Sequence, residues 1–177
     1  DNSKMYITSQ SGVVLYKNGR LFSIADTTSS IDHLRTVYPH QNDLLVGTER
    51  GLYILKDRKY KPISDIQAAI NSIVSIKDGR VFVGSEEGIY EYVNQNNLRR
   101  LNISQFSSTN FINFLISRGN DLIAGTNNGL VIIRFTDNDY KVIRLTKNNG
   151  LIDLETNANS AFFDRDGMLW FGTPSGL

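Results

Sequence analysis

The sequence predicts an all-β fold built from a four-stranded unit that recurs about every forty residues. Three observations lead to this prediction: a short apolar template repeats along the chain, turn residues precede its copies, and no helical periodicity separates them. The chain has 177 residues, of which 40% are hydrophobic and 21% are charged, so its composition suits a globular domain with a core.

The template has nine positions: three apolar residues, glycine, threonine or serine, two variable residues, glycine, and one apolar residue. Its full copies occupy residues 44–52, 81–89, 122–130 and 169–177. A weaker copy at 5–13 has Thr8 in place of the first glycine. The second glycines are 39, 37, 41 and 47 residues apart, a spacing too long for leucine-rich repeats.

Each part of the template has a mechanical reason. The apolar triplet indicates a strand buried on both faces, because a half-buried strand would alternate apolar and polar residues. The two variable residues and the closing glycine fit a hairpin turn that ends at positive φ, which glycine adopts without strain. The hydroxyl groups that follow the strand are expected to bond back to the turn, namely those of Thr48, Ser85, Thr126 and Thr173.

Further strands flank the template on both sides. Upstream lies an apolar strand that ends in turn residues such as Asp78-Gly79 or Asp166-Gly167, a strong hairpin signal. Downstream, residues 51–56 and 88–93 indicate third strands, and a polar turn then leads to a short fourth strand. Four antiparallel strands per repeat predict the blades of a β-propeller.

Divided in this way, the chain holds three full blades and a partial blade at each end. The expected bounds are about 4–24 (partial), 31–63, 66–101, 111–145 and 155–177 (partial). A blade cannot bury both of its faces alone, so neighbouring blades must cover it. The blades can belong to a longer propeller, or the two partial blades can pair to close a four-bladed ring, and the first of these is preferred.

The last template copy with its turn, Asp-Arg-Asp-Gly-Met-Leu-Trp-Phe-Gly-Thr-Pro-Ser-Gly-Leu at 164–177, resembles the two-component regulator propeller repeat. Residues 149–151 and 157–160 also resemble that family's approach to a blade. The resemblance implies a seven-bladed ring in the periplasmic sensor region of a Bacteroidetes-type hybrid two-component histidine kinase. It further implies an oligosaccharide ligand, a homodimer, and a kinase in the rest of the sensor protein.

Composition argues against several other functions. Lysine and arginine total 19 against 18 acidic residues, and this balance gives no field that would attract nucleic acid. No apolar run approaches the roughly 18 residues of a membrane span, so no direct membrane insertion by this segment is expected. The absence of cysteine excludes disulfides and thiolate metal sites.

No catalytic, cofactor or metal site is expected in this segment. The two histidines, His33 and His40, would lie about 23 Å apart on one strand, too far to share a metal. Residues 164–167 have the start of a calcium loop but lack the later oxygen ligands, which favours a turn. Trp170 stands in the apolar triplet and is expected to pack between blades rather than to stack on a sugar.

Ligand contact is expected from loops that join one blade to the next, at 25–32, 64–69, 102–110 and 146–156. These loops are rich in neutral hydrogen-bonding side chains suited to sugar hydroxyls. The predicted ligand-binding residues, at or near the inner-strand entrances, are His33, Arg35, Asn71, Asn110, Asn113, Asn157 and Asn159. A protein-interaction scaffold and a polysaccharide lyase or hydrolase are the alternatives to a sensor.

Overall fold

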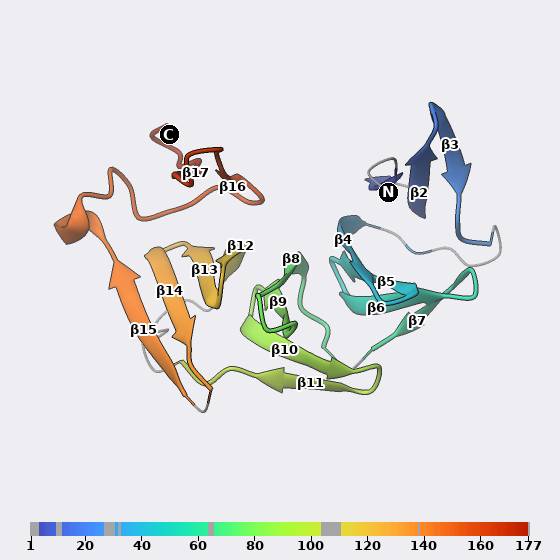
Figure 1. Ribbon diagram of the computed structural model, residues 1–177, viewed down its shortest axis with the longest axis horizontal. Helices are drawn as coiled ribbons and strands as arrows, with labels where there is room; N and C mark the ends of the chain where they lie inside the picture. Colours follow the sequence, from blue (N-terminus) through green and yellow to red (C-terminus); the bar gives the residue numbers. More distant parts are fainter. Residues whose placement is uncertain are drawn as a thin grey trace.

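The computed structural model describes residues 4–9, 12–26, 31, 33–63, 66–103, 111–137 and 139–176. Its strands form five antiparallel sheets, here called blades 1 to 5 (Figure 1). Blade 1 holds β1 (Lys4–Ser9), β2 (Gly12–Lys17) and β3 (Arg20–Ser23). Blade 2 holds β4 (Leu34–His40), β5 (Asp43–Thr48), β6 (Gly51–Lys56) and β7 (Lys59–Pro62).

The later blades follow the same order. Blade 3 holds β8 (Ile70–Ser75), β9 (Val81–Ser85), β10 (Gly88–Asn94) and β11 (Asn97–Arg100). Blade 4 holds β12 (Ile112–Arg118), β13 (Asp121–Thr126), β14 (Gly129–Phe135) and β15 (Tyr140–Leu145). A 3-10 turn, η1 (Lys147–Asn149), precedes blade 5, which holds β16 (Ala161–Phe163) and β17 (Leu169–Phe171).

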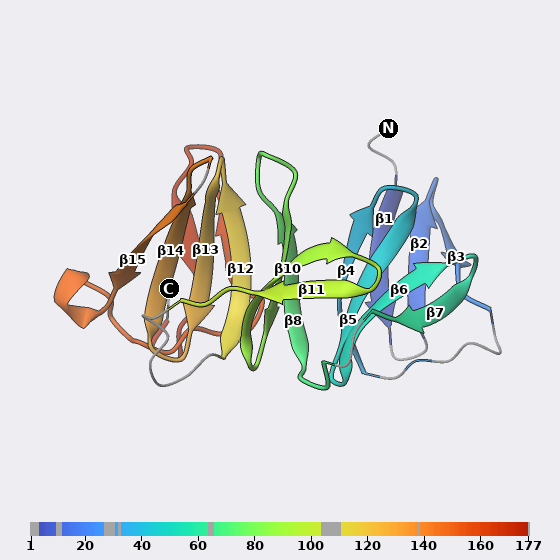
Figure 2. The same cartoon turned by 90° about the horizontal axis from the view of Figure 1, so that it is seen from below.

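The blades stand side by side along an arc in sequence order, as Figure 1 shows from blue to red, and Figure 2 shows the same blades from below. Strands β4, β8, β12 and β16 line the inner side of the arc, and β7, β11 and β15 lie at its outer edge. The predicted all-β fold of four-stranded antiparallel propeller blades is therefore confirmed. No helix in the described ranges is long and apolar enough to span a membrane.

The template hairpins have the predicted turn. The closing glycines of the template take positive φ, for example +123° at Gly51 and +130° at Gly88. The Thr48 hydroxyl donates to the Gly51 carbonyl over 3.0 Å and accepts from the Arg50 amide over 3.0 Å. Ser85 and Thr126 make the same pair of bonds in their own turns. The hydroxyl after each buried strand thus holds the turn that reverses it.

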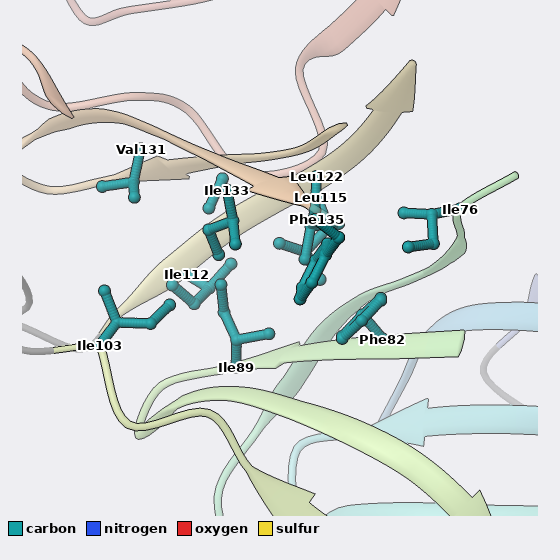
Figure 3. Close-up of a cluster of buried hydrophobic side chains, with 11 residues drawn as sticks. Ile76, Phe82, Ile89, Ile103, Ile112, Leu115, Leu122, Val131, Ile133 and Phe135 are labelled. Carbon is teal, nitrogen blue, oxygen red and sulfur yellow. The ribbon is translucent and has the colours of Figure 1, made fainter. Parts of the chain in front are cut away.

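The core lies between blades, because each template strand presents alternate side chains to its two neighbours. The middle residue of the triplet points to the following blade: Leu45 packs with Ile73 and Val83 of blade 3. Figure 3 shows the next interface, where Phe82 meets Phe135 of blade 4, with ring centroids 5.0 Å apart. Each blade is thus buried by the blades beside it.

The first glycine of the template permits this close approach. A Cβ atom on Gly47 would lie 2.7 Å from the Ile70 side chain, and one on Gly84 would lie 2.7 Å from that of Ile112. Ile70 and Ile112 each begin the inner strand of the following blade. At Gly47 and Gly84 the following blade therefore packs against the strand backbone, whereas a Cβ on Gly125 would meet Phe114 of its own blade.

Candidate functional site

Three predicted ligand residues occupy the same structural position in successive blades. Arg35, Asn71 and Asn113 are each the second residue of an inner strand, where the register with the template strand shifts. Such a bulge leaves one residue outside the regular pairing and re-aims its side chain. Asn159 holds the related place in blade 5, just before Ser160, whose carbonyl accepts from the Gly172 amide over 2.8 Å.

The structure brings Arg35 and Asn71 into direct contact. Arg35 Nη1 donates to Asn71 Oδ1 over 2.6 Å, and Asn71 Nδ2 donates to the Ile112 carbonyl over 2.8 Å. This chain of bonds therefore links blades 2, 3 and 4. The Asn71 side chain is buried, with 2% of the residue exposed, and it already satisfies a donor and an acceptor within the protein.

Asn113 makes the corresponding link between blades 4 and 5. Its Nδ2 donates to Asn127 Oδ1 over 2.8 Å and to Thr156 Oγ1 over 3.3 Å, and its carbonyl accepts from the Asn159 amide over 3.1 Å. Like Asn71, Asn113 is buried. Both asparagines therefore connect blades in this structure, and their contact with a ligand stays a prediction.

Other predicted residues are exposed. His33, Arg35, Asn157 and Asn159 all lie at the surface, and the last has φ +53°. Asn110 lies outside the described residues. Exposed donors and acceptors on a rigid backbone are what a ligand can contact without displacing a blade.

Two carboxylates complete the exposed group, and sequence reasoning missed both. Arg35 Nη2 lies 3.4 Å from Glu49 Oε1, and Arg35 Nη1 lies 4.0 Å from Glu86 Oε1 on the next blade. His33 Nδ1 lies 3.7 Å from Glu49 Oε2. We call His33, Arg35, Glu49 and Glu86 the entrance cluster. Ion pairs this exposed contribute little to stability, so a ligand can rearrange them at small cost.

The signal for these carboxylates lies in the template itself. Glu49 and Glu86 stand in its first variable position, directly after Thr48 and Ser85. Their amides donate to the His33 and Ala69 carbonyls, just before the inner strands β4 and β8. Asn127 holds the same position in blade 4 and contacts Asn113. The variable position of the template is therefore the neighbour of the bulged inner-strand residue.

The long loop before blade 5 is held against blade 4. The Gly129 amide donates to the Leu154 carbonyl over 2.6 Å, and Thr156, which is buried, donates through its hydroxyl to the Thr126 carbonyl. Asp153 Oδ2 accepts from the Ser175 hydroxyl over 2.8 Å, and this bond lowers the pKa of the Asp153 carboxyl. The loop at 146–156, one of those expected to contact a ligand, is thus tied at several points.

The histidines lie in different surroundings. His33 belongs to the entrance cluster, whereas His40 packs edge-on against Tyr92, with ring centroids 5.0 Å apart. Within the ranges that the structure describes, no three histidine or acidic side chains gather so as to hold a metal ion. Asp164 accepts from the Asp166 and Met168 amides and from Trp170 Nε1, which makes it the cap of a turn.

No family model and no curated protein matches the sequence, whereas solved structures do. The extracellular domain of BT3049, a proposed hybrid two-component system of B. thetaiotaomicron, superposes with a TM-score of 0.70 at 20% identity over 96% of this chain. That of BT4673, from the same organism, gives 0.72 at 20% identity over 97%. Virginiamycin B lyase from Staphylococcus aureus gives 0.57 at 13% identity over 99% of this chain and 68% of its own.

The chain spans about a quarter of the length of the two extracellular domains, with 25% of each covered. These proteins are of the class that the propeller-repeat resemblance predicted. At such low identity the similarity shows the fold, because propellers support many unrelated functions.

Proposed function

We propose that this chain is part of the periplasmic ligand-sensing propeller of a two-component signalling receptor, and that its ligand is an oligosaccharide. The proposal is supported by the propeller-repeat template and by the structural similarity to extracellular domains of hybrid two-component systems. In this account the segment is not catalytic, and it needs no cofactor. It passes a ligand-dependent change to a histidine kinase in the rest of the protein.

The observation that carries the ligand proposal is the entrance cluster. Arg35 supplies several N–H donors, and Glu49 and Glu86 supply carboxylate acceptors on either side of it. Vicinal sugar hydroxyls donate and accept at once, so they fit a site where charged donors and acceptors alternate. The buried Asn71 below Arg35 fixes the guanidinium, which reduces the entropy lost on binding.

We further propose that the arc belongs to a seven-bladed ring and that the sensor acts as a homodimer. Support for additional blades comes from template side chains that lie exposed at both ends of the arc. Met5 and Ile7 of blade 1 and Trp170 of blade 5 are 58%, 38% and 43% exposed. Their counterparts within the arc are buried against a neighbouring blade.

A protein-interaction scaffold is the second candidate, because the same exposed apolar side chains could receive a partner protein. Ligand binding separates the two functions. A scaffold of this kind would bind through the ends of the arc and would not depend on Arg35.

Thermal melting against a panel of host and plant oligosaccharides tests the sensor proposal. Binding to the folded state alone raises stability by about 2.7 kcal/mol at a hundredfold excess over Kd. We expect one saccharide to raise the melting temperature of the wild type and of Arg58→Ala, a control at an exposed outer turn that pairs with Asp26. Arg35→Ala should lose that shift relative to its own unliganded melt. An equal shift in Arg35→Ala would contradict the role of the entrance cluster, and no shift in the wild type with any saccharide would contradict the sensor proposal.

A further inference from the structure

Glu91 breaks the pattern of the repeat. Three residues after the second template glycine, the other blades carry Leu15, Ile54 and Ile132, whereas blade 3 carries Glu91. The residue is buried, with 9% exposed. The other blades show that the fold is satisfied by an apolar residue here, and a buried carboxylate needs compensation. Its presence therefore calls for a reason other than packing.

The partner of Glu91 does not supply that reason. Arg99 donates to Glu91 Oε2 from Nε over 3.1 Å and also from Nη2, and this pairing raises the pKa of Arg99. The Arg99 side chain is 66% exposed, so water could hydrate it equally well. Replacing a half-buried ion pair by an apolar residue is often neutral or stabilising. The pair is thus a polar feature that the blade does not require.

Glu91 lines a cavity of about 500 Å³ between blades 3 and 4. Glu91 and Asn102 lie on its blade 3 side, and Phe135, Asp139 and Tyr140 on its blade 4 side. Its volume lies within the range of small-molecule sites. The cavity opens beside the turn between β14 and β15, at the opposite end of the strands from the hairpins that carry the entrance cluster. The two sites are therefore on different faces of the arc.

Arg80 forms a fixed donor in the same cavity. Its guanidinium lies 4.3 Å from the Phe135 ring centroid, across the blade interface, and two of its nitrogens donate to Asp78 Oδ2 over 2.9 and 2.7 Å. These bonds lower the pKa of Asp78. At the corresponding position, blades 2 and 4 carry Asp43 and Asp121. Arg80 is therefore a second departure from the repeat that faces the same space.

The charges around the cavity balance. Its lining includes the guanidinium groups of Arg80, Arg99 and Arg100 and the carboxylates of Glu91, Asp137 and Asp139. Tyr140 is held at the edge because its hydroxyl donates to the Asn102 carbonyl over 2.9 Å. A site with this balance offers many donors and acceptors and no net field that would select an ion.

A smaller cavity between blades 1 and 2, of about 250 Å³, lacks the buried carboxylate. Leu15 and Leu55 lie in its wall, and its polar lining comes from two turns, at 41–43 and at Asp57 and Arg58. Leu15 stands where blade 3 has Glu91. A crevice with polar turn residues at the outer part of a blade interface is therefore a property of the fold, whereas the buried carboxylate of Glu91 and the guanidinium of Arg80 belong to the interface between blades 3 and 4.

We propose that the cavity between blades 3 and 4 is a second binding site, specific for a neutral, hydroxyl-rich ligand, namely a saccharide unit. Glu91 is its buried acceptor, and Arg80 and Arg99 are its donors. The balanced charge disfavours an anionic sugar, and the polar lining disfavours an apolar ligand. This site stands independently of the entrance cluster, so each can be present without the other.

Calorimetry and amide NMR of the intact 177-residue chain with cellotriose, maltotriose and xylotriose test the proposal. We expect at least one trisaccharide to bind and to shift amide signals at 99–102 and 135–140. Glu91→Leu, which restores the residue type of the other blades, should weaken this binding at least about tenfold, as expected for a lost charged hydrogen bond. It should melt at or above the wild-type temperature.

Two further variants keep the outcome interpretable. Arg80→Met preserves an unbranched side chain over Phe135 and removes the guanidinium, so it should also weaken binding. Glu49→Gln in the entrance cluster should leave binding at this cavity unchanged. Full affinity in Glu91→Leu, no shift at 99–102 and 135–140 with any of the three trisaccharides, or binding only of a sulfated chondroitin disaccharide would overturn the proposal. Loss of binding in Glu49→Gln alone would assign the ligand to the entrance cluster.

Discussion

The blades in the middle of the arc and the blades at its two ends carry the same template, but its apolar side chains are buried in the middle blades and partly exposed in the end blades. The middle triplet residue is fully buried at Leu45 and Phe82 in blades 2 and 3, whereas Trp170 in blade 5 is 43% exposed. Val46 and Val83 are likewise fully buried, while Ile7 in blade 1 is 38% exposed. The residue type is apolar in every case. The comparison shows that a blade's core is supplied by its neighbours rather than by its own sheet.

The polar features follow the same rule. Asn71 bridges blades 2 to 4, Asn113 connects blades 4 and 5, and the cavity at Glu91 lies between blades 3 and 4. The interfaces between blades therefore provide the buried contacts that stabilise the chain, and they also contain the candidate sites. The stability lost in a variant should therefore depend on whether the substituted side chain faces another blade.

The largest difference is expected for the middle triplet position. Phe82→Ala should lower the free energy of unfolding by about 3–5 kcal/mol, because it leaves a cavity among buried side chains. Trp170→Ala at the equivalent exposed position should lower it by less than about 1 kcal/mol. Urea unfolding of both variants measures the difference. Equal losses would show that blade 5 is covered as completely as blade 3.

The strand glycines should give the next largest contrast. In Gly84→Ala the new Cβ would lie 2.7 Å from the Ile112 side chain of the following blade, and we expect a loss of about 1–3 kcal/mol from overpacking. In Gly172→Ala the nearest atoms lie at 3.2 Å and belong to Asn157 and Ser160, which precede β16, so the loss should be smaller. Urea midpoints compare them, and a larger loss in Gly172→Ala would refute the packing role of this glycine.

For the asparagines too, the loss of stability on substitution should depend on how deeply the side chain is buried. Asn71→Ala removes the link between Arg35 and the Ile112 carbonyl and should cost about 1–3 kcal/mol, since it leaves a buried acceptor without a partner. Asn157→Ala, at an exposed site before blade 5, should change stability by no more than about 0.5 kcal/mol. Thermal melts of the two variants measure this, and a neutral Asn71→Ala would show that the link is dispensable.

The smallest effect concerns pH at the exposed end of the arc. The Trp170 indole N–H, with two backbone amides, lowers the pKa of Asp164. A lowered pKa means that Asp164 favours the folded hairpin above its unfolded pKa, near 3.9, and loses this contribution as pH falls through the lower folded value. Trp170 is the single tryptophan, so its fluorescence should change in this acidic range. Asp164→Asn should flatten that change, and an identical titration in this variant would contradict the assignment.

Most of the fold was predictable because the template is local. Glycine spacing, the hydroxyl after each strand and the Asp-Gly turns all act within one hairpin, and each has the predicted conformation or bond. Contacts between blades were not predictable in the same way. Arg35 and Asn71 are 36 residues apart, and no local pattern states that their side chains meet.

The candidate sites likewise have a part that was predictable from local sequence and a part that was not. The inner-strand entrances were identified from sequence, but the shared bulge of Arg35, Asn71 and Asn113 depends on strand register. Glu49 and Glu86 were missed because they stand at a variable template position, where any polar residue suits a turn. Glu91 was visible in the sequence as a charged residue among apolar equivalents. Comparison of repeats within one chain can therefore locate residues that the fold alone does not require.

Hydrogen–deuterium exchange of the wild-type chain tests most directly whether the interfaces between blades carry its stability. Amides of β9, in the middle blade, should exchange slowest, with β5 and β13 close behind, because all three strands have a blade on each side. Amides of β1 and β17, at the two ends of the arc, should exchange many times faster although their sequences follow the same template. Equal protection of β17 and β9 would contradict the account, because it would mean that a blade is stable without neighbours.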